Sequence, residues 1–531
     1  MNTILQTARE KTAGHGWLSR LGTRLETYET TDPSPFGPLL LAFGLYIFIV
    51  FAVGGRPLWH DELYTYYIAK SPTLAQFIAA VNGIDLQPPL QYVLARMSLS
   101  LFGNSDLAIR FPFIIAFAVS SICLYHFVRR RLGRFYGLTA MLVFWLGPFM
   151  QYSAEARPYA LVLGFLGVAM LGWQAAIEGR RRRLGLFALG FGVWGMIVSH
   201  AFSPLLVAVL GLAELVRSVD RRKIDWPVWV ALVIPSPFMI LYLPIFRRFE
   251  GWTALPPEFQ ASYFKMITFY GDLLSYVSVV LLVGLVAALI VYRFQPDLTK
   301  ASAYAAHKHE VALVLGLLSL PIVTNLILMR TGGAFWPRYC IPTGIGFSLL
   351  FVHILAKLTN SSRAVAAIVA YSVLLGIATR LGVQIASPRD RAMVKEISLK
   401  ELDPHLPLVD ASGLTFFEMN KREDAGLLSR VYYLTDRGAA IRYAHATIFE
   451  GTGKLRDYWP IRGNVEPYHD FIAQTDHFFV LGTPDYPEDW LIPKLIDDGA
   501  DLQFKGELHS TYRDHMIFEV TIHPTKASPS K

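Results

Sequence analysis

The sequence has few charged residues and almost no cysteine. Asp, Glu, Lys and Arg make up 17% of its 531 residues, hydrophobic residues make up 53%, and the mean hydropathy is +0.38. Soluble domains carry about 25% charged residues, so this composition indicates a membrane protein. The only cysteines, Cys123 and Cys340, lie in or beside apolar runs, and they are too few to build a disulfide framework.

The N-terminal residues and the net charge further limit the class of protein. Residues 1–32 are polar and basic and lack the apolar core of a cleavable signal peptide, so we expect a cytoplasmic tail there. The net charge of +8 would favour nucleic acid as a partner of a soluble protein. Here the basic residues cluster in short loops between apolar runs, which is typical of a membrane protein and predicts no nucleic-acid partner.

Apolar runs recur along residues 33–387, most of them near the ~20 residues that a bilayer needs. They cover residues 33–55, 111–128, 135–152, 158–177, 226–246, 273–292, 311–329, 340–356 and 364–385, with a longer run at 184–213. This pattern predicts a multi-pass, α-helical transmembrane domain over residues 33–387.

Charge gives the expected topology. Basic clusters at 129–134, 180–183, 221–223, 293–308 and 357–363 should be cytoplasmic by the positive-inside rule. The run at 184–213 lies between two such clusters, so we expect two short helices that meet outside near His200. The total is then about eleven spans. We expect the protein to lie in a bacterial inner membrane, with the residues after 387 in the periplasm.

The composition changes to that of a soluble domain at Pro388. Strands are expected at 406–411, 430–434, 478–482, 502–508 and 516–522, and helices at 414–420 and 488–498. Strands interleaved with helices predict a small C-terminal α/β domain over 388–531.

The segment 56–110, between the first two apolar runs, is too long for a simple connector. It begins with the acidic pair Asp61-Glu62, and Asp85 precedes the Pro88-Pro89 pair. Apolar residues then recur at helical spacing from Pro89 to Leu101, which predicts an amphipathic helix in the membrane interface. Carboxylates above apolar helices suit chemistry on a substrate that is half lipid and half polar.

Several motifs stand in a characteristic order on the outer face. They are Asp61-Glu62, Pro88–Tyr92, Leu101-Phe102-Gly103 leading to Arg110, Glu155–Tyr159 and Arg338-Tyr339. In this order the chain resembles the GT-C superfamily of polyprenyl-phosphate-sugar glycosyltransferases. The nearest branch holds protein O-mannosyltransferases, aminoarabinose transferases and rhizobial galacturonic-acid transferases. The family often has His before the proline pair, where this chain has Gln87.

The resemblance implies roles for the carboxylates. Asp61 matches the catalytic base, which takes the proton of an acceptor hydroxyl. Glu62 would orient the acceptor or, with Asp61, hold a divalent metal such as Mg or Mn. Asp85 fits either a catalytic role or a helix cap. From their position alone, Asp61 and Glu62 fit ordinary surface carboxylates as well as they fit catalytic ones.

The basic and aromatic residues would bind the donor. Arg157 and Arg338 would hold the lipid phosphate, since guanidinium suits phosphate oxygens; a snorkelling arginine is the alternative for Arg157. Tyr159 and Tyr339 are hydroxyl contacts or interface aromatics. His200 is a donor to phosphate or sugar, or a buried helix-end histidine.

These features predict a membrane glycosyltransferase with a polyprenyl-phosphate-sugar donor. The acceptor is a lipid such as lipopolysaccharide, a glycan or a protein, and the transfer inverts the anomeric centre. No nucleotide-binding motif is present, which favours a lipid-linked donor over a nucleotide sugar. A flippase of lipid-linked saccharides is the alternative, although a transporter should carry charges at mid-membrane. A third reading is a scaffold that displays the C-terminal domain.

Overall fold

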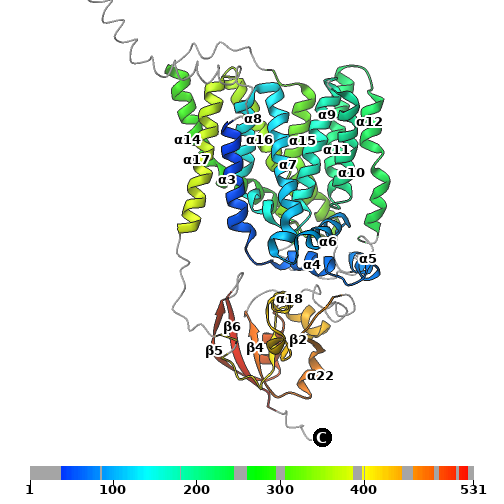
Figure 1. Ribbon diagram of the computed structural model, residues 1–531, viewed down its shortest axis with the longest axis vertical. Coiled ribbons are helices and arrows are strands. Elements are labelled where there is room, and N and C mark those ends of the chain that lie inside the picture. Colours follow the sequence, from blue (N-terminus) through cyan, green and yellow to red (C-terminus); the bar gives the residue numbers. More distant parts are fainter. Residues whose placement is uncertain are drawn as a thin grey trace, which may run out of the picture. The chain divides into compact units, whose positions relative to one another are not determined.

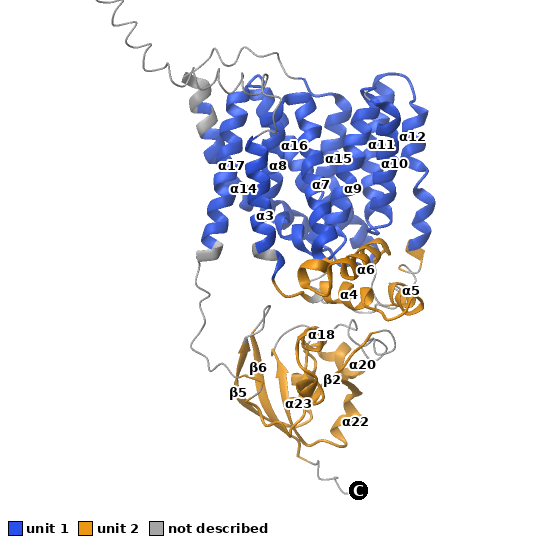
Figure 2. Cartoon of the chain, in the orientation of Figure 1, with its two compact units in different colours: residues 1–55, 110–241, 261–387 blue, residues 56–109, 242–260, 388–531 orange. Residues whose placement is uncertain are grey.

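The structure is a computed structural model, and it divides into two compact units (Figure 2). It describes residues 37–83, 87–179, 181–243, 245, 260–294, 305–386, 398–399, 401–444, 459–483, 489–509 and 514–523. Unit 1 is Met1–Gly55, Arg110–Leu241 and Ala261–Ser387, and unit 2 is Arg56–Ile109, Tyr242–Gln260 and Pro388–Lys531. The predicted tail 1–32 lies outside the described residues.

Unit 1 is a bundle of long apolar helices (Figure 1). They are α3 (Gly37–Gly54), α7 (Asp106–Leu132), α8 (Arg134–Leu146), α9 (Tyr159–Ile177), α10 (Arg182–Ile197), α11 (Ser203–Asp220), α12 (Trp226–Val233), α14 (Tyr263–Phe294), α15 (Lys308–Thr331), α16 (Thr343–Leu358) and α17 (Arg363–Ala386). Among the described residues, α7, α9, α14, α15 and α17 are long and apolar enough to cross a membrane. The structure therefore confirms a multi-pass helical protein, whereas the count of about eleven spans stays a prediction.

Short breaks interrupt several of the apolar runs. The run at 184–213 divides into α10 and α11, as its flanking charges predicted. Two runs expected to be single helices are broken instead. After α8 the chain turns into the 3₁₀ helix η1 (Pro148–Ala154), and after α12 into η2 (Ser236–Tyr242). Proline at the start of η1 and near the start of η2 explains both, because proline lacks the N–H that an α-helix needs.

One end of the unit 1 bundle carries the basic clusters and a buried ion network. Arg217 on α11 donates to both carboxylate oxygens of Glu214, over 2.8 and 2.7 Å, and to Asp225 over 2.9 Å. Trp173 of α9 donates to the same Glu214 over 2.9 Å, and Arg182 of α10 binds Asp225 over 2.5 Å. The network ties α9, α10 and α11 together at this end.

The loop part of unit 2 contains α4 (His60–Ala69), α5 (Leu74–Gly83) and α6 (Leu90–Phe102). Arg96 on α6 holds the end of α4 by donating to the carbonyls of Ala69, at 2.9 Å, and Ser71, at 2.7 Å. The amphipathic helix expected from Pro89 to Leu101 is therefore present as α6. Its exposed side carries an apolar stripe at Val93, Met97 and Leu101.

The C-terminal part of unit 2 is a sheet with helices on its faces, as predicted. Its strands are β1 (Leu408–Asp410), β2 (Val431–Thr435), β3 (Asn464–Pro467), β4 (His477–Gly482), β5 (Asp501–His509) and β6 (Asp514–Thr521), in the order β3-β2-β1-β4-β6-β5. Strands β1 to β4 pair in parallel, and β6 pairs antiparallel with its two neighbours, β4 and β5. The sequence did not predict β3, whose Asn464–Pro467 stretch ends in a proline.

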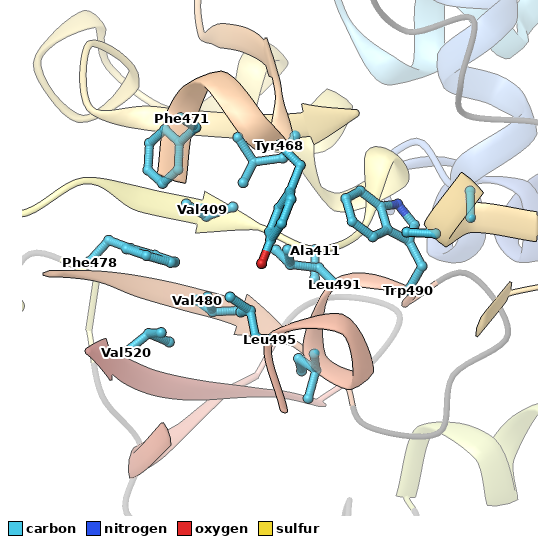
Figure 3. Packing of buried hydrophobic residues seen from close by; sticks show 14 of the residues in the cluster. Val409, Ala411, Tyr468, Phe471, Phe478, Val480, Trp490, Leu491, Leu495 and Val520 are labelled. Carbon is cyan, nitrogen blue, oxygen red and sulfur yellow. The ribbon is translucent and has the colours of Figure 1, made fainter. Parts of the chain in front are cut away.

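Helices cover this sheet and complete its core. They are α18 (Gly413–Arg422), α19 (Ala425–Leu428), α20 (Arg437–Ala439), the π-helical turn η6 (Ala440–Ala444), α22 (Tyr468–Ile472) and α23 (Leu491–Asp497). On one face Val409, Val480 and Val520 pack with Trp490 and Leu495 (Figure 3).

Two carboxylates are buried where the parallel strands end. Asp410 closes β1, and its Oδ1 accepts from the Ser412 N–H over 3.0 Å. Asp489 precedes α23, and its Oδ1 accepts from the Ile492 N–H over 3.2 Å. Burial raises the pKa of Asp489 to about 7 and the pKa of Asp410 well above its ordinary value.

Candidate functional site

The acidic pair lies in the first turn of α4, where carboxylates are favoured by the helix dipole. Glu62 is fully buried, and its carboxylate accepts from the Trp59 backbone N–H over 3.2 Å. That contact is half of a capping box. Asp61 is partly exposed, so within the pair it is the carboxylate that can meet a substrate. Asp85 lies outside the described residues.

A pocket lies among five elements of the unit 1 bundle, and its empty volume of about 390 Å³ includes space open to solvent. The start of α9, the turn between α10 and α11 with the first residues of α11, the middle of α15, the 3₁₀ helix η5 (Pro337–Cys340) and the two residues before α16 surround it. Its lining is Tyr159, Val162, His200, Phe202, Ser203, Leu205, Leu206, Leu320, Thr324, Arg338, Tyr339, Ile341 and Pro342. The structure thus brings together Tyr159, His200, Arg338 and Tyr339, which lie up to 180 positions apart in the chain.

His200 is held by the turn between α10 and α11. Its Nδ1 accepts from the Phe202 backbone N–H over 3.2 Å, so in the neutral imidazole the proton is on Nε2. The ring centroid lies 5.7 Å from that of Tyr159 and 5.6 Å from that of Tyr339. Tyr339 in turn stacks on Phe202 at 4.8 Å. These contacts fix the orientation of a histidine that can donate from Nε2.

Arg338 gives the cavity a positive charge. It lies on η5, and its guanidinium carbon is 4.9 Å from the centroid of the Trp336 ring. A cation over an indole face is held by the ring quadrupole, so Trp336 orients Arg338. Leucine, isoleucine and valine side chains supply much of the remaining wall. Such a cavity suits a ligand with an anionic head and an apolar chain.

Arg157 is buried in the bend between η1 and α9. Its backbone N–H donates to the Glu155 carbonyl over 2.8 Å, and its side chain is 5% exposed. The bend places Arg157 before Tyr159, at the end of α9 that lines the cavity, but Arg157 is absent from the lining itself. An arginine this buried does not fit the snorkelling alternative, in which the head reaches water.

Sequence reasoning gave no role to several residues of this site. Phe202 and Thr324 line the cavity, and Trp336 supports Arg338. A hydroxyl within the apolar run 311–329 was a signal for Thr324. The Trp-x-Arg spacing was a weaker signal for Trp336, because only the 3₁₀ turn of η5 brings the indole under the guanidinium.

A divalent metal ion at Asp61 and Glu62 stays a prediction. In the part of the chain that the structure describes, no three or more His, Cys, Asp or Glu residues are grouped to hold a metal ion. Glu62 is already engaged with the Trp59 N–H, so the pair offers a small set of ligands for a divalent ion that prefers octahedral oxygen coordination.

Known proteins resemble the chain in part or over most of its length. The chain is similar to ArnT from Cupriavidus metallidurans bound to undecaprenyl phosphate, with 12% identity, a TM-score of 0.49, and coverage of 92% of this chain and 98% of that chain. It is also similar to the S. cerevisiae protein O-mannosyltransferase Pmt1-Pmt2 complex bound to the sugar donor, with 18% identity, a TM-score of 0.32, and coverage of 43% and 35%. No curated protein matches the sequence.

A family model matches part of the sequence. Residues 86–241 match dolichyl-phosphate-mannose-protein mannosyltransferase. The matched stretch begins at the proline pair and includes Arg157, Tyr159 and His200. The match covers less than a third of the chain, and it agrees with the resemblance that the motifs carry.

Proposed function

We propose that the protein transfers a sugar from a polyprenyl-phosphate donor to a lipid, glycan or protein acceptor on the outer face of the membrane. The observation that carries this proposal is the unit 1 cavity, with a guanidinium and a histidine donor among apolar walls. Its chemistry matches a lipid phosphate, and two of its residues, Tyr159 and His200, fall within the family match at 86–241.

Arg338 binds the phosphate group of the donor. Guanidinium groups bind phosphate oxygens in pairs of parallel hydrogen bonds, and the indole of Trp336 holds Arg338 in one orientation. His200 donates from Nε2 to the same phosphate or to a sugar hydroxyl. Arg157 lies two positions before Tyr159, which lines the cavity, and contributes a second positive charge.

Asp61 is the general base. It takes the proton of the acceptor hydroxyl while the hydroxyl oxygen attacks the anomeric carbon of the sugar. The bond between that carbon and the phosphate oxygen breaks, and the lipid phosphate leaves with the electron pair. Negative charge grows on this oxygen in the transition state, where a fixed cation is most effective. Attack opposite to the leaving group inverts the anomeric centre.

The outer location follows from charge. Arg129, Arg130 and Arg131 end α7, and Arg182 lies in the first turn of α10. The cavity lies at the opposite end of α10, by the turn between α10 and α11. If basic ends face the cytoplasm, the cavity opens on the outer side.

The test is sugar transfer from a synthetic polyprenyl-phosphate-sugar donor in nanodiscs, with donor binding measured separately. The proposal predicts transfer by the wild-type protein and weaker donor binding in Arg338→Ala. Movement of the lipid-linked sugar across the membrane without any transfer would instead support a flippase.

A further inference from the structure

The C-terminal part of unit 2 contacts the loop that carries the acidic pair, and both belong to the same compact unit. The contact is made by α18, which follows β1, on α4. The two helices lie about 350 residues apart in the chain, so this is a long-range contact within unit 2.

Helix α18 is firmly attached to its own sheet. Phe416 and Phe417 are fully buried, and Phe416 packs against Tyr433 of β2 with ring centroids 5.7 Å apart. The last turn is held by Arg462, whose Nε donates to the Asn420 carbonyl over 3.2 Å and whose Nη2 donates to the Glu423 carbonyl over 3.0 Å. A helix end whose carbonyls are satisfied in this way does not fray readily.

The first tie between α18 and α4 is aromatic. The Tyr67 hydroxyl donates to the Phe417 carbonyl over 2.8 Å. The Tyr67 ring stacks on Trp459, with centroids 5.0 Å apart and planes 16° apart. Tyr64, one turn earlier on α4, meets Trp459 edge-on at 5.5 Å. Two successive turns of α4 are thereby held against one indole.

The second tie is ionic. Lys421, in the last turn of α18, pairs with Asp106, the first residue of α7, which also belongs to unit 2. Its ammonium also lies 5.0 Å from the centroid of the Tyr66 ring on α4. The Lys421 and Asp106 side chains are only 13% and 21% exposed, so water screens this pair less than a surface pair.

We propose that α18 is a positioning element for the transfer reaction, with Tyr67 and Lys421 as positioning residues that hold α4 and so orient Asp61 in its first turn. This inference rests on the proposed function of Asp61. A base must meet its hydroxyl within hydrogen-bond reach, and misplacement by about 1 Å costs on the order of 10²-fold in rate. The C-terminal domain therefore acts on turnover, while donor binding in unit 1 is independent of it.

The chain offers a matched control for Lys421. Lys494 on α23 also pairs with a carboxylate, Asp498, at 2.8 Å, and lies 4.9 Å from the centroid of a tyrosine ring, Tyr468. Both of its partners belong to the C-terminal domain itself. Lys421→Met should lower kcat by about 10- to 100-fold with an unchanged donor Kd, whereas Lys494→Met should keep the wild-type kcat.

Two further measurements separate positioning from folding. The charge-swapped pair Asp106→Lys with Lys421→Asp should recover most of the lost kcat. Hydrogen exchange should become faster in α4 of Lys421→Met and stay unchanged in β4. If Lys421→Met does not fold, Tyr67→Phe decides, since it deletes one hydroxyl and keeps the ring stack; a wild-type kcat in that variant overturns the proposal.

The outcomes distinguish this inference from the proposed function. Full turnover in Lys421→Met and Tyr67→Phe, together with an inactive Asp61→Asn, would overturn the positioning role alone. Full turnover in Asp61→Asn would end the assignment of the base, and with it the role proposed for α18.

Discussion

Replacing Arg338 tests the donor site most quantitatively. A hydrogen bond between charged groups contributes about 1.5–3 kcal/mol, which corresponds to roughly a 10- to 150-fold change in Kd at 1.4 kcal/mol per tenfold. Arg338→Ala should weaken the binding of a polyprenyl-phosphate donor by that factor. Lysine keeps the charge but loses the planar fork, so Arg338→Lys should fall between alanine and wild type.

The indole under Arg338 gives a second, smaller perturbation. Trp336 is 4.9 Å from the guanidinium carbon, and a cation–π contact of this kind contributes about 0.5–1 kcal/mol. Trp336→Leu should therefore weaken donor binding by roughly two- to fivefold without removing any charge. The double variant Trp336→Leu with Arg338→Ala should bind the donor as weakly as Arg338→Ala alone, because the indole then has no guanidinium to orient.

The assay is equilibrium binding of a labelled donor to the protein in nanodiscs. Arg330, exposed in the last turn of α15, is the matched control, and Arg330→Ala should bind the donor like wild type. Equal donor affinity in wild type, Arg338→Ala and Arg330→Ala would refute the cavity as the phosphate site.

Three other predictions test orientation, domain roles and pH. With Cys123 and Cys340 replaced, a cysteine at Ser203 should react with an impermeant thiol reagent from outside and one at Ser218 should not; the reverse labelling would invert the topology. A properly inserted truncation after Ser387 should still bind donor but turn over slowly, and a complete loss of donor binding would contradict the separation of roles. Because the folded-state pKa of Asp489 is raised to about 7, the contribution of this carboxyl to the stability of the C-terminal domain should be fully present below pH ~4 and should fall, by up to about 4 kcal/mol, as pH rises to 7. Asp489→Asn keeps the cap to Ile492 and should flatten this dependence in urea pulse proteolysis; an unchanged pH profile would show that the carboxyl is not the cause.

The sequence predicts helix positions well where hydropathy alone decides them. The run at 158–177 is α9 and the run at 364–385 is α17, because about 20 apolar residues have few other stable forms in a bilayer. Breaks within a run are harder to predict. Pro148 and Pro237 end helices inside apolar stretches, whereas Pro321 lies within α15 without ending it, so the local packing decides the effect of each proline.

Site residues were predicted by motif, but their contacts were not. Tyr159, His200, Arg338 and Tyr339 share one cavity, as expected of residues that were all predicted to lie on the same face. The burial of Glu62 against the Trp59 N–H could not be read from two adjacent acidic residues. Nor could the bond from Tyr67 to Phe417, since no local pattern joins residues 350 positions apart.

The central claim is that Asp61 takes the proton of the acceptor, and one substitution tests it directly. Asparagine has nearly the shape of aspartate and can still form hydrogen bonds, but it cannot accept this proton. Glu62→Gln is the control, because glutamine can still accept from the Trp59 N–H and so preserve the capping contact. The measurement is sugar transfer from a synthetic polyprenyl-phosphate donor, with donor binding followed in parallel. We expect Asp61→Asn to lose about 10²–10⁴-fold in turnover with unchanged donor affinity, and Glu62→Gln to be milder; near-normal turnover in Asp61→Asn would contradict the mechanism.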